Sequence, residues 1–82
     1  MALPTLHREA GFEFFFRALD RPEPPHVHVR GNDGSAKVWL VPEVNIQETH
    51  GYTPRERDEI IRITEEHRIE WLAFWDRFFG AR

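Results

Sequence analysis

Cysteine is missing from the 82-residue sequence, which excludes a disulfide framework and a metal site built on thiolates. The sequence also lacks an apolar run long enough to cross a bilayer, and residues 1–5 lack the charged and apolar regions of a signal peptide. These absences favour a cytoplasmic protein with no membrane partner. The net charge of −3 excludes recruitment of nucleic acid by overall charge, although a local basic patch is still compatible with RNA as a ligand.

The length predicts a single domain over residues 1–82. A chain of this size buries a little over about 60% of the surface that its unfolded form exposes, so its core is thin. No internal repeat, linker or glycine-rich phosphate loop interrupts the sequence. We therefore expect one small packed unit.

The first half of the sequence alternates apolar and polar residues, which is typical of strands. Phe12, Phe14 and Phe16 share one side of such a strand and are expected to face the core. Residues 31–34, Gly-Asn-Asp-Gly, favour a hairpin turn because these residues tolerate a positive φ angle. The expected strands cover residues 5–9, 12–19, 26–30, 36–41 and 44–47.

The second half changes to a helical period and predicts a helix over about residues 54–79. Thr53 is a suitable N-cap, Pro54 suits the first helical position, and Glu56 completes a capping box. Gly80 favours the end of the helix. The sequence thus predicts an α+β fold: an antiparallel sheet of three to five strands within residues 3–48, packed through its phenylalanine face against one long C-terminal helix.

The least ordinary stretch reads Pro-Glu-Pro-Pro-His-Val-His-Val-Arg and leads into the third expected strand. Its prolines fix φ and remove backbone donors, so the approach is neither helix nor central strand. Because side chains alternate along a strand, Val27 and Val29 are expected inside. His26, His28 and Arg30 then share the opposite face. The pattern leaves open whether they form a preorganised site or only the wet face of an edge strand.

Five large aromatic rings lie within nine residues near the end of the predicted helix and point to nearly every side of it. Burial against the strands accounts for part of them, but one small sheet covers one side only. We therefore expect contact with a second copy or with a dedicated protein partner. Together with the proline loop, the predicted partner-binding residues are Trp71, Trp75, Phe78, Phe79, Pro24 and Pro25.

The order of these signals resembles the small bacterial proteins of domain-of-unknown-function family 4160. The resemblance rests mainly on Pro-Pro-His-Val-His-Val at residues 24–29 and is supported by a helix with Trp75 near its end. It implies a partner from domain-of-unknown-function family 2442, often encoded nearby, in a two-gene module suspected of toxin–antitoxin activity. It implies no established reaction and no catalytic assignment for the two histidines.

A first hypothesis for the histidine pair is metal-independent cleavage of RNA, which needs an acid, a base and a cation on the phosphate. Histidine titrates near neutral pH, so His26 and His28 are candidates for acid and base. Arg30 is the candidate for holding the phosphate. Lys37, on the expected neighbouring strand, is a weaker candidate for the same role.

A second hypothesis is a metal site, because His-x-His on a strand is a recurring half-site for zinc, iron or nickel. Arg30 on the same face disfavours a dication, so we expect no cofactor, with a divalent metal on His26 and His28 as the alternative. A third ligand would come from Glu13, Asp33, His50 or His67.

A third hypothesis assigns no chemistry to the histidines. The proline loop is then a docking surface, and the domain acts by binding its partner. In this case His67 packs within the helix stripe, whereas His7 and His50 are surface residues.

Overall fold

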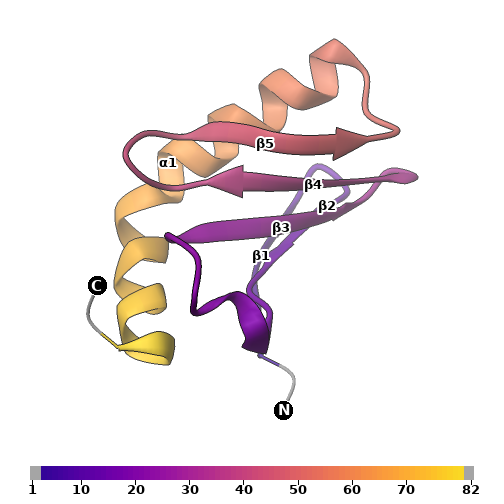
Figure 1. Cartoon of the computed structure of the whole chain (residues 1–82). Coiled ribbons are helices and arrows are strands. Elements are labelled where there is room, and N and C mark those ends of the chain that lie inside the picture. The colour runs from indigo at the N-terminus through magenta and orange to yellow at the C-terminus, as the bar shows by residue number, and fades with distance from the viewer. Residues whose placement is uncertain (1–2, 81–82) are drawn as a thin grey trace.

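A computed structural model describes residues 3–80 and shows a five-stranded sheet followed by one long helix (Figure 1). The strands pair antiparallel in sequence order, β1-β2-β3-β4-β5. The predicted α+β fold is confirmed. The elements are β1 (Thr5–Glu9), β2 (Phe12–Phe15), the 3-10 turn η1 (Ala18–Asp20), β3 (His26–Gly31), β4 (Gly34–Trp39), β5 (Asn45–His50) and α1 (Pro54–Phe79).

Helix α1 begins and ends where the capping residues place it. The Glu56 amide donates to the Thr53 hydroxyl at 3.1 Å, and the Thr53 amide donates to the Glu56 carboxylate at 2.9 Å. This capping box satisfies two backbone donors that the first turn leaves unpaired. At the other end, the amide of Gly80, whose φ is 86°, donates to the Asp76 carbonyl at 2.9 Å. The predicted helix bounds are therefore confirmed.

The core lies between α1 and one face of the sheet. Phe12, Phe14 and Phe16 are buried, as their alternation predicts. The Phe14 ring lies 5.1 Å from that of Trp71, and the Phe16 ring meets that of Trp75 edge-on at 5.2 Å, measured between centroids. These aromatic contacts join β2 and its continuation to the second half of the helix.

The second strand is shorter than predicted, because it ends at Phe15 rather than at residue 19. The carboxylate of Asp20 accepts a hydrogen bond from the Arg17 amide at 2.7 Å, and this side chain replaces a strand partner. The chain then folds into η1, which leaves Leu19 90% exposed. Residues 12–16 retain the alternation, but the following residues belong to a turn.

The last two strands also have bounds that differ from the prediction. β4 ends at Trp39 instead of residue 41, since the next amide, that of Leu40, donates to Pro25 outside the ladder at 2.9 Å. β5 extends to His50 and thus beyond residue 48, because it pairs with β4 back to Ser35. The bounds of these two strands thus differ from the prediction by one to three residues, while the predicted hairpin between the third and fourth strands is confirmed.

Among residues 3–80, α1 is the only α-helix, so the opposite face of the sheet carries no helical layer. None of the helical segments in this described part is long and apolar enough to span a membrane. A hollow of about 130 Å³ lies on the open face, where Phe15, Arg17, His28 and Lys37 form part of its lining. The open face is therefore the side on which polar side chains of β2, β3 and β4 gather.

The structure corrects the expectation that both helix tryptophans contact another chain. Trp71 is 0% exposed and Trp75 is 2% exposed, because α1 presents both indoles to the phenylalanines of the sheet. Phe79 is partly buried, and Phe78 retains 38% of its surface in solvent. The sheet covers more of the aromatic cluster than the sequence suggested, so only the last rings are available to a partner.

We predict that Trp71→Ala lowers the free energy of unfolding by about 3–5 kcal/mol, since it removes a fully buried ring and leaves a cavity. The matched control is Ile69→Ala, because Ile69 lies on the same helix and is 82% exposed. The control should stay within about 0.5 kcal/mol of wild type. Urea unfolding measures both, and equal effects of the two substitutions would contradict the assigned core.

Candidate functional site

The two histidines of the proline segment lie on a central strand and are both buried. β3 pairs with β2 on one side and β4 on the other, so the idea of a wet face on an edge strand is wrong. His26 is 0% exposed and His28 is 8% exposed. Val27 and Val29 are also buried, as predicted. All four residues are therefore enclosed, and the simple inside–outside alternation fails for the histidines.

Aromatic rings from three elements enclose the histidines. His26 lies between Trp39 of β4 and Trp75 of α1, with ring centroids 5.5 and 5.4 Å away. His28 lies 5.6 Å from the ring of Phe15 on the neighbouring strand. The two imidazoles are 4.9 Å apart. Packing against large rings fixes the orientation of both imidazoles, as a preorganised site requires.

Asp20 of η1 brings the third polar group to the histidines, and sequence reasoning did not include it. Its Oδ1 lies 2.9 Å from His28 Nε2 and 3.1 Å from His26 Nε2. Because His28 Nε2 also lies 3.1 Å from Oδ2, this imidazole contacts both carboxylate oxygens. The short turn after β2 thus places a carboxylate directly against the start of β3. We call Asp20, His26 and His28 the buried triad.

The two nitrogens of His26 have different environments. Nδ1 lies 2.9 Å from the carbonyl of Pro24, which only accepts, so Nδ1 carries a proton and donates. Nε2 of the same ring faces the Asp20 carboxylate. Although 3.1 Å separates it from Oδ1, the alignment is not that of a hydrogen bond, and Nε2 is a buried polar atom without a hydrogen-bond partner. Such an atom calls for a proton or a cation.

Electrostatics hold the other two members in the states that bind metals. Burial alone would raise the pKa of Asp20, but hydrogen bonds from His28 and from the Arg17 amide hold it below its ordinary value. Burial lowers the pKa of His28, and the hydrogen bond to Asp20 only partly offsets this effect. At neutral pH the triad therefore contains a carboxylate and a neutral imidazole, and these are the forms that ligate metals.

The cations proposed for phosphate binding are already engaged with carboxylates. Arg30 Nε donates to Glu13 at 2.7 Å, and its guanidinium lies over the Phe15 ring at 4.4 Å. Lys37 Nζ donates to Glu23 at 2.7 Å. Both cations line the hollow on the open face beside His28, but neither contacts the triad.

The ligands proposed to complete a His-x-His metal site do not lie in the triad. Within the described chain, the group that surrounds His26 and His28 contains Asp20 as its third member. The sequence did carry a signal for it: an acidic residue ends the aromatic strand segment, three residues after Arg17 and just before the prolines. The residues considered instead were Glu13, Asp33, His50 and His67.

Comparison with known proteins identifies the family. The sequence matches the family described as Domain of unknown function (DUF4160) over residues 11–76. The chain belongs to this family. No curated protein and no solved structure gives a significant match. In this DUF4160 domain, the matched stretch contains the entire buried triad and most of the helix that packs against it.

The proline loop of the DUF4160 domain meets the end of α1 at a surface groove of about 450 Å³. Pro24 is exposed, whereas Pro25 is buried at the base of the loop. Carbon-rich side chains form most of the lining. These are Pro22, Pro24, Pro25, Val41, Trp75 and Phe79. Of the predicted partner-binding residues, the two prolines, Trp75 and Phe79 thus meet at one place, even though Trp75 contributes little exposed surface.

We predict that Glu13 remains ionised in the folded protein far below its ordinary pH range. Hydrogen bonds from Arg30 and Thr5 lower its pKa from 4.5 to about 2. A depressed folded-state pKa stabilises the fold above pH 4.5, and this contribution is lost as pH falls toward 2. Arg30→Gln should move the pKa of Glu13 upward, as measured by carboxyl-carbon NMR. An unchanged titration in this variant would contradict the assigned pairing.

Proposed function

We propose that this DUF4160 domain is a metal-binding module that holds a divalent transition metal, zinc or ferrous iron, in the buried triad. The observation that carries the proposal is the His26 Nε2 atom, which is buried, unpaired by hydrogen bonds and aimed at a carboxylate. Two imidazoles and one carboxylate form a ligand set used for both metals. The absence of cysteine disfavours ions that require thiolates.

The geometry of the triad supports this ligand set. One donor atom from each residue lies within 4.8 Å of the other two. Ligands at about 2.0–2.1 Å from a tetrahedral ion stand roughly 3.3 Å apart, so small side-chain shifts accommodate an ion. The Nδ1–H of His26 donates to the Pro24 carbonyl, which is the type of outer contact that orients metal-bound histidines.

A metal at this place would act on the proline loop. Asp20 belongs to η1, and His26 begins β3, so the ligands stand at the two ends of the loop. The bound ion would supply Lewis acidity and positive charge, while the protein residues hold the loop against α1. Because His26 is 0% exposed, we assign the triad a role in shaping the loop.

Zinc or ferrous iron should raise the melting temperature of the wild-type protein. An ion present at one hundred times its Kd stabilises the folded state by about 2.7 kcal/mol. For a domain of this size, the expected shift is on the order of 10–20 °C. Asp20→Asn keeps the side-chain volume but removes the charge. The affinity of this variant for the metal should fall by at least about 10–100-fold. Calorimetric melting with and without metal provides the measurement.

The matched control for this experiment is His50→Ala, which removes an exposed imidazole of β5 that is not a member of the triad. It should retain the full metal-dependent shift. Equal shifts in Asp20→Asn and His50→Ala would place the metal elsewhere. A wild-type protein that gains no stability from either metal would refute the proposal.

The loop held in this way is also the proposed contact for a protein partner. Exposed Pro24 lies beside the groove that ends at Phe79, and Phe78 is 38% exposed on the same end of α1. This arrangement supports a protein-binding role, and we propose that the chain is one component of a toxin–antitoxin-like two-gene module. The neighbouring gene would encode the partner.

Light scattering should detect a complex between the purified domain and the product of the neighbouring gene. Phe78→Asp should weaken that complex at least about tenfold, since a charge replaces an apolar contact. Ile69→Asp is the control, because Ile69 is exposed two and a half helical turns away and faces a different side. A domain that stays monomeric in the presence of the product of the neighbouring gene would contradict the partner assignment.

Metal-independent cleavage of RNA is the second candidate function. It is favoured by His28, which lines the hollow on the open face together with Arg17, Arg30 and Lys37. The full burial of His26 opposes a pair of histidines acting on one phosphate, since the second imidazole does not reach the surface. RNA cleavage that persists in a chelator and is lost in His28→Ala would favour this function over metal binding.

A further inference from the structure

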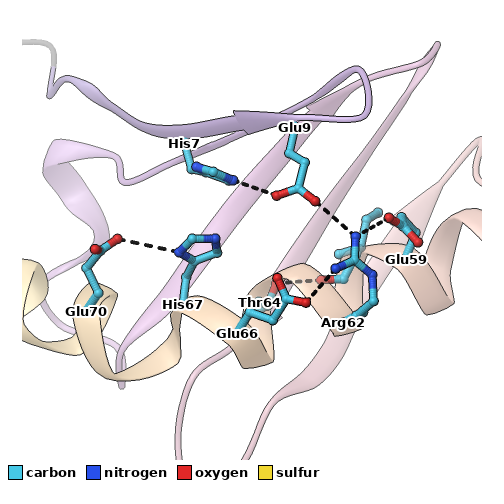
Figure 2. A network of polar contacts seen from close by, with 9 residues as sticks. His7, Glu9, Glu59, Arg62, Thr64, Glu66, His67 and Glu70 are labelled. Atoms are coloured by element: carbon cyan, nitrogen blue, oxygen red, sulfur yellow. Dashed lines mark hydrogen bonds and ion pairs between the residues drawn. The ribbon is translucent and has the colours of Figure 1, made fainter.

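A second cluster of ligating side chains lies between the edge strand β1 and the middle of α1 (Figure 2). Its members are His7 and Glu9 of β1 and His67 of α1. One donor atom from each lies within 4.8 Å of the other two. The three side chains come from segments 60 residues apart in sequence, 67 minus 7, so the tertiary fold creates the cluster.

We propose that His7, Glu9 and His67 form a second site for a divalent transition metal of the zinc class, which clasps β1 to α1. The site is independent of the buried triad and of the function proposed for it. Its side chains are 26–34% exposed, so a metal would enter directly from solvent. Two imidazoles and a carboxylate again match the ligand preference of zinc.

The carboxylate is oriented for this role. Glu9 Oε1 lies 2.8 Å from His7 Nε2, whereas Oε2 accepts from Arg62 at 3.0 Å. Arg62 thus holds one oxygen and leaves the other beside the imidazole. An outer contact of this kind positions a metal-binding carboxylate.

The imidazole of His67 is fixed by packing. It stacks on the buried Trp71 indole at 10° and 5.2 Å between centroids, and lies 4.2 Å from the ring of His7. Its Nδ1 lies 3.6 Å from a carboxylate oxygen of Glu70 (Figure 2). Within the part of the chain that the structure describes, no hydrogen bond joins the imidazoles of His7 and His67. The ion-pair network accounts for Glu9 and Arg62, and the Trp71 indole holds the His67 ring beside that of His7.

Charge around the cluster favours a cation. The polar network drawn in Figure 2 contains four carboxylates and one guanidinium. Nearby negative charge lowers the free energy of a bound dication and offsets the competition from Arg62. The carboxylates are those of Glu9, Glu59, Glu66 and Glu70.

The clasp would act on an edge strand. β1 is at the edge of the sheet, pairs with β2 alone, and has an irregular register between Thr5 and His7. A metal bridge from His7 to His67 would fix this strand against the helix. The function expected for the site is therefore metal-dependent ordering of the N-terminal edge.

Zinc titration followed by nitrogen NMR of the histidine side chains tests the proposal in the full-length protein. Zinc should shift the ring nitrogens of His7 and His67, and Glu9→Gln should weaken this binding at least about tenfold. The same shifts should survive in Asp20→Asn, which separates this site from the buried triad. His50→Ala serves as the control and should bind as wild type does.

Unshifted His7 and His67 resonances at saturating zinc would overturn the proposal, as would unchanged affinity in Glu9→Gln. A second variant, His67→Gln, tests the same site through a different ligand, because it removes an imidazole while keeping a polar side chain on the helix. This variant should bind one zinc ion fewer per chain than wild type, and its circular dichroism spectrum should show the same helix content. Retention of that equivalent would also overturn the assignment.

Discussion

A buried carboxylate at Asp20 is the constraint on which the arrangement of the proline segment depends. Removing an ionised carboxylate from water costs several kcal/mol unless partners compensate. Here two imidazoles and the Arg17 amide surround it. These contacts hold η1 against the start of β3. The residues between η1 and β3 must therefore form a closed loop. The prolines stiffen that loop, so the triad and its cover form one unit.

The rest of the core makes the triad rigid. His26 lies between Trp39 and Trp75, so its position depends on the helix being docked on the sheet. That docking depends in turn on Phe16, whose ring meets Trp75 edge-on. An error in the packing of α1 would therefore displace a ligand of the candidate metal site. Fold stability and site geometry are coupled here through the indole of Trp75, which is 2% exposed.

The sequence predicted the fold class, the helix bounds and the burial of Val27 and Val29, because local periodicity and capping determine them. It did not predict Asp20, since η1 arises from a side chain capturing a backbone amide within a segment whose pattern favours a strand. It placed His26 and His28 on the face opposite the buried valines but left open whether that face is covered. Alternation predicts which face of a strand a side chain occupies. The residues of η1 and α1 that cover this face come from other parts of the sequence, so no local pattern predicts the cover.

The two candidate metal sites differ in the kind of stability they offer. Asp20 and His28 are eight residues apart, whereas His7 and His67 are separated by 60. The entropy lost on closing a loop of n residues scales as (3/2)RT ln n. A metal that closes the 60-residue loop therefore raises the free energy of the unfolded chain by about 1.8 kcal/mol more than a metal that closes the eight-residue loop. The buried triad instead gains from satisfying an orphaned nitrogen and a desolvated carboxylate. The family match begins at residue 11, so it includes the triad but excludes His7 and Glu9. The matched region therefore contains the whole triad, whereas the clasp at β1 depends on two residues outside it and on the tertiary structure of this chain.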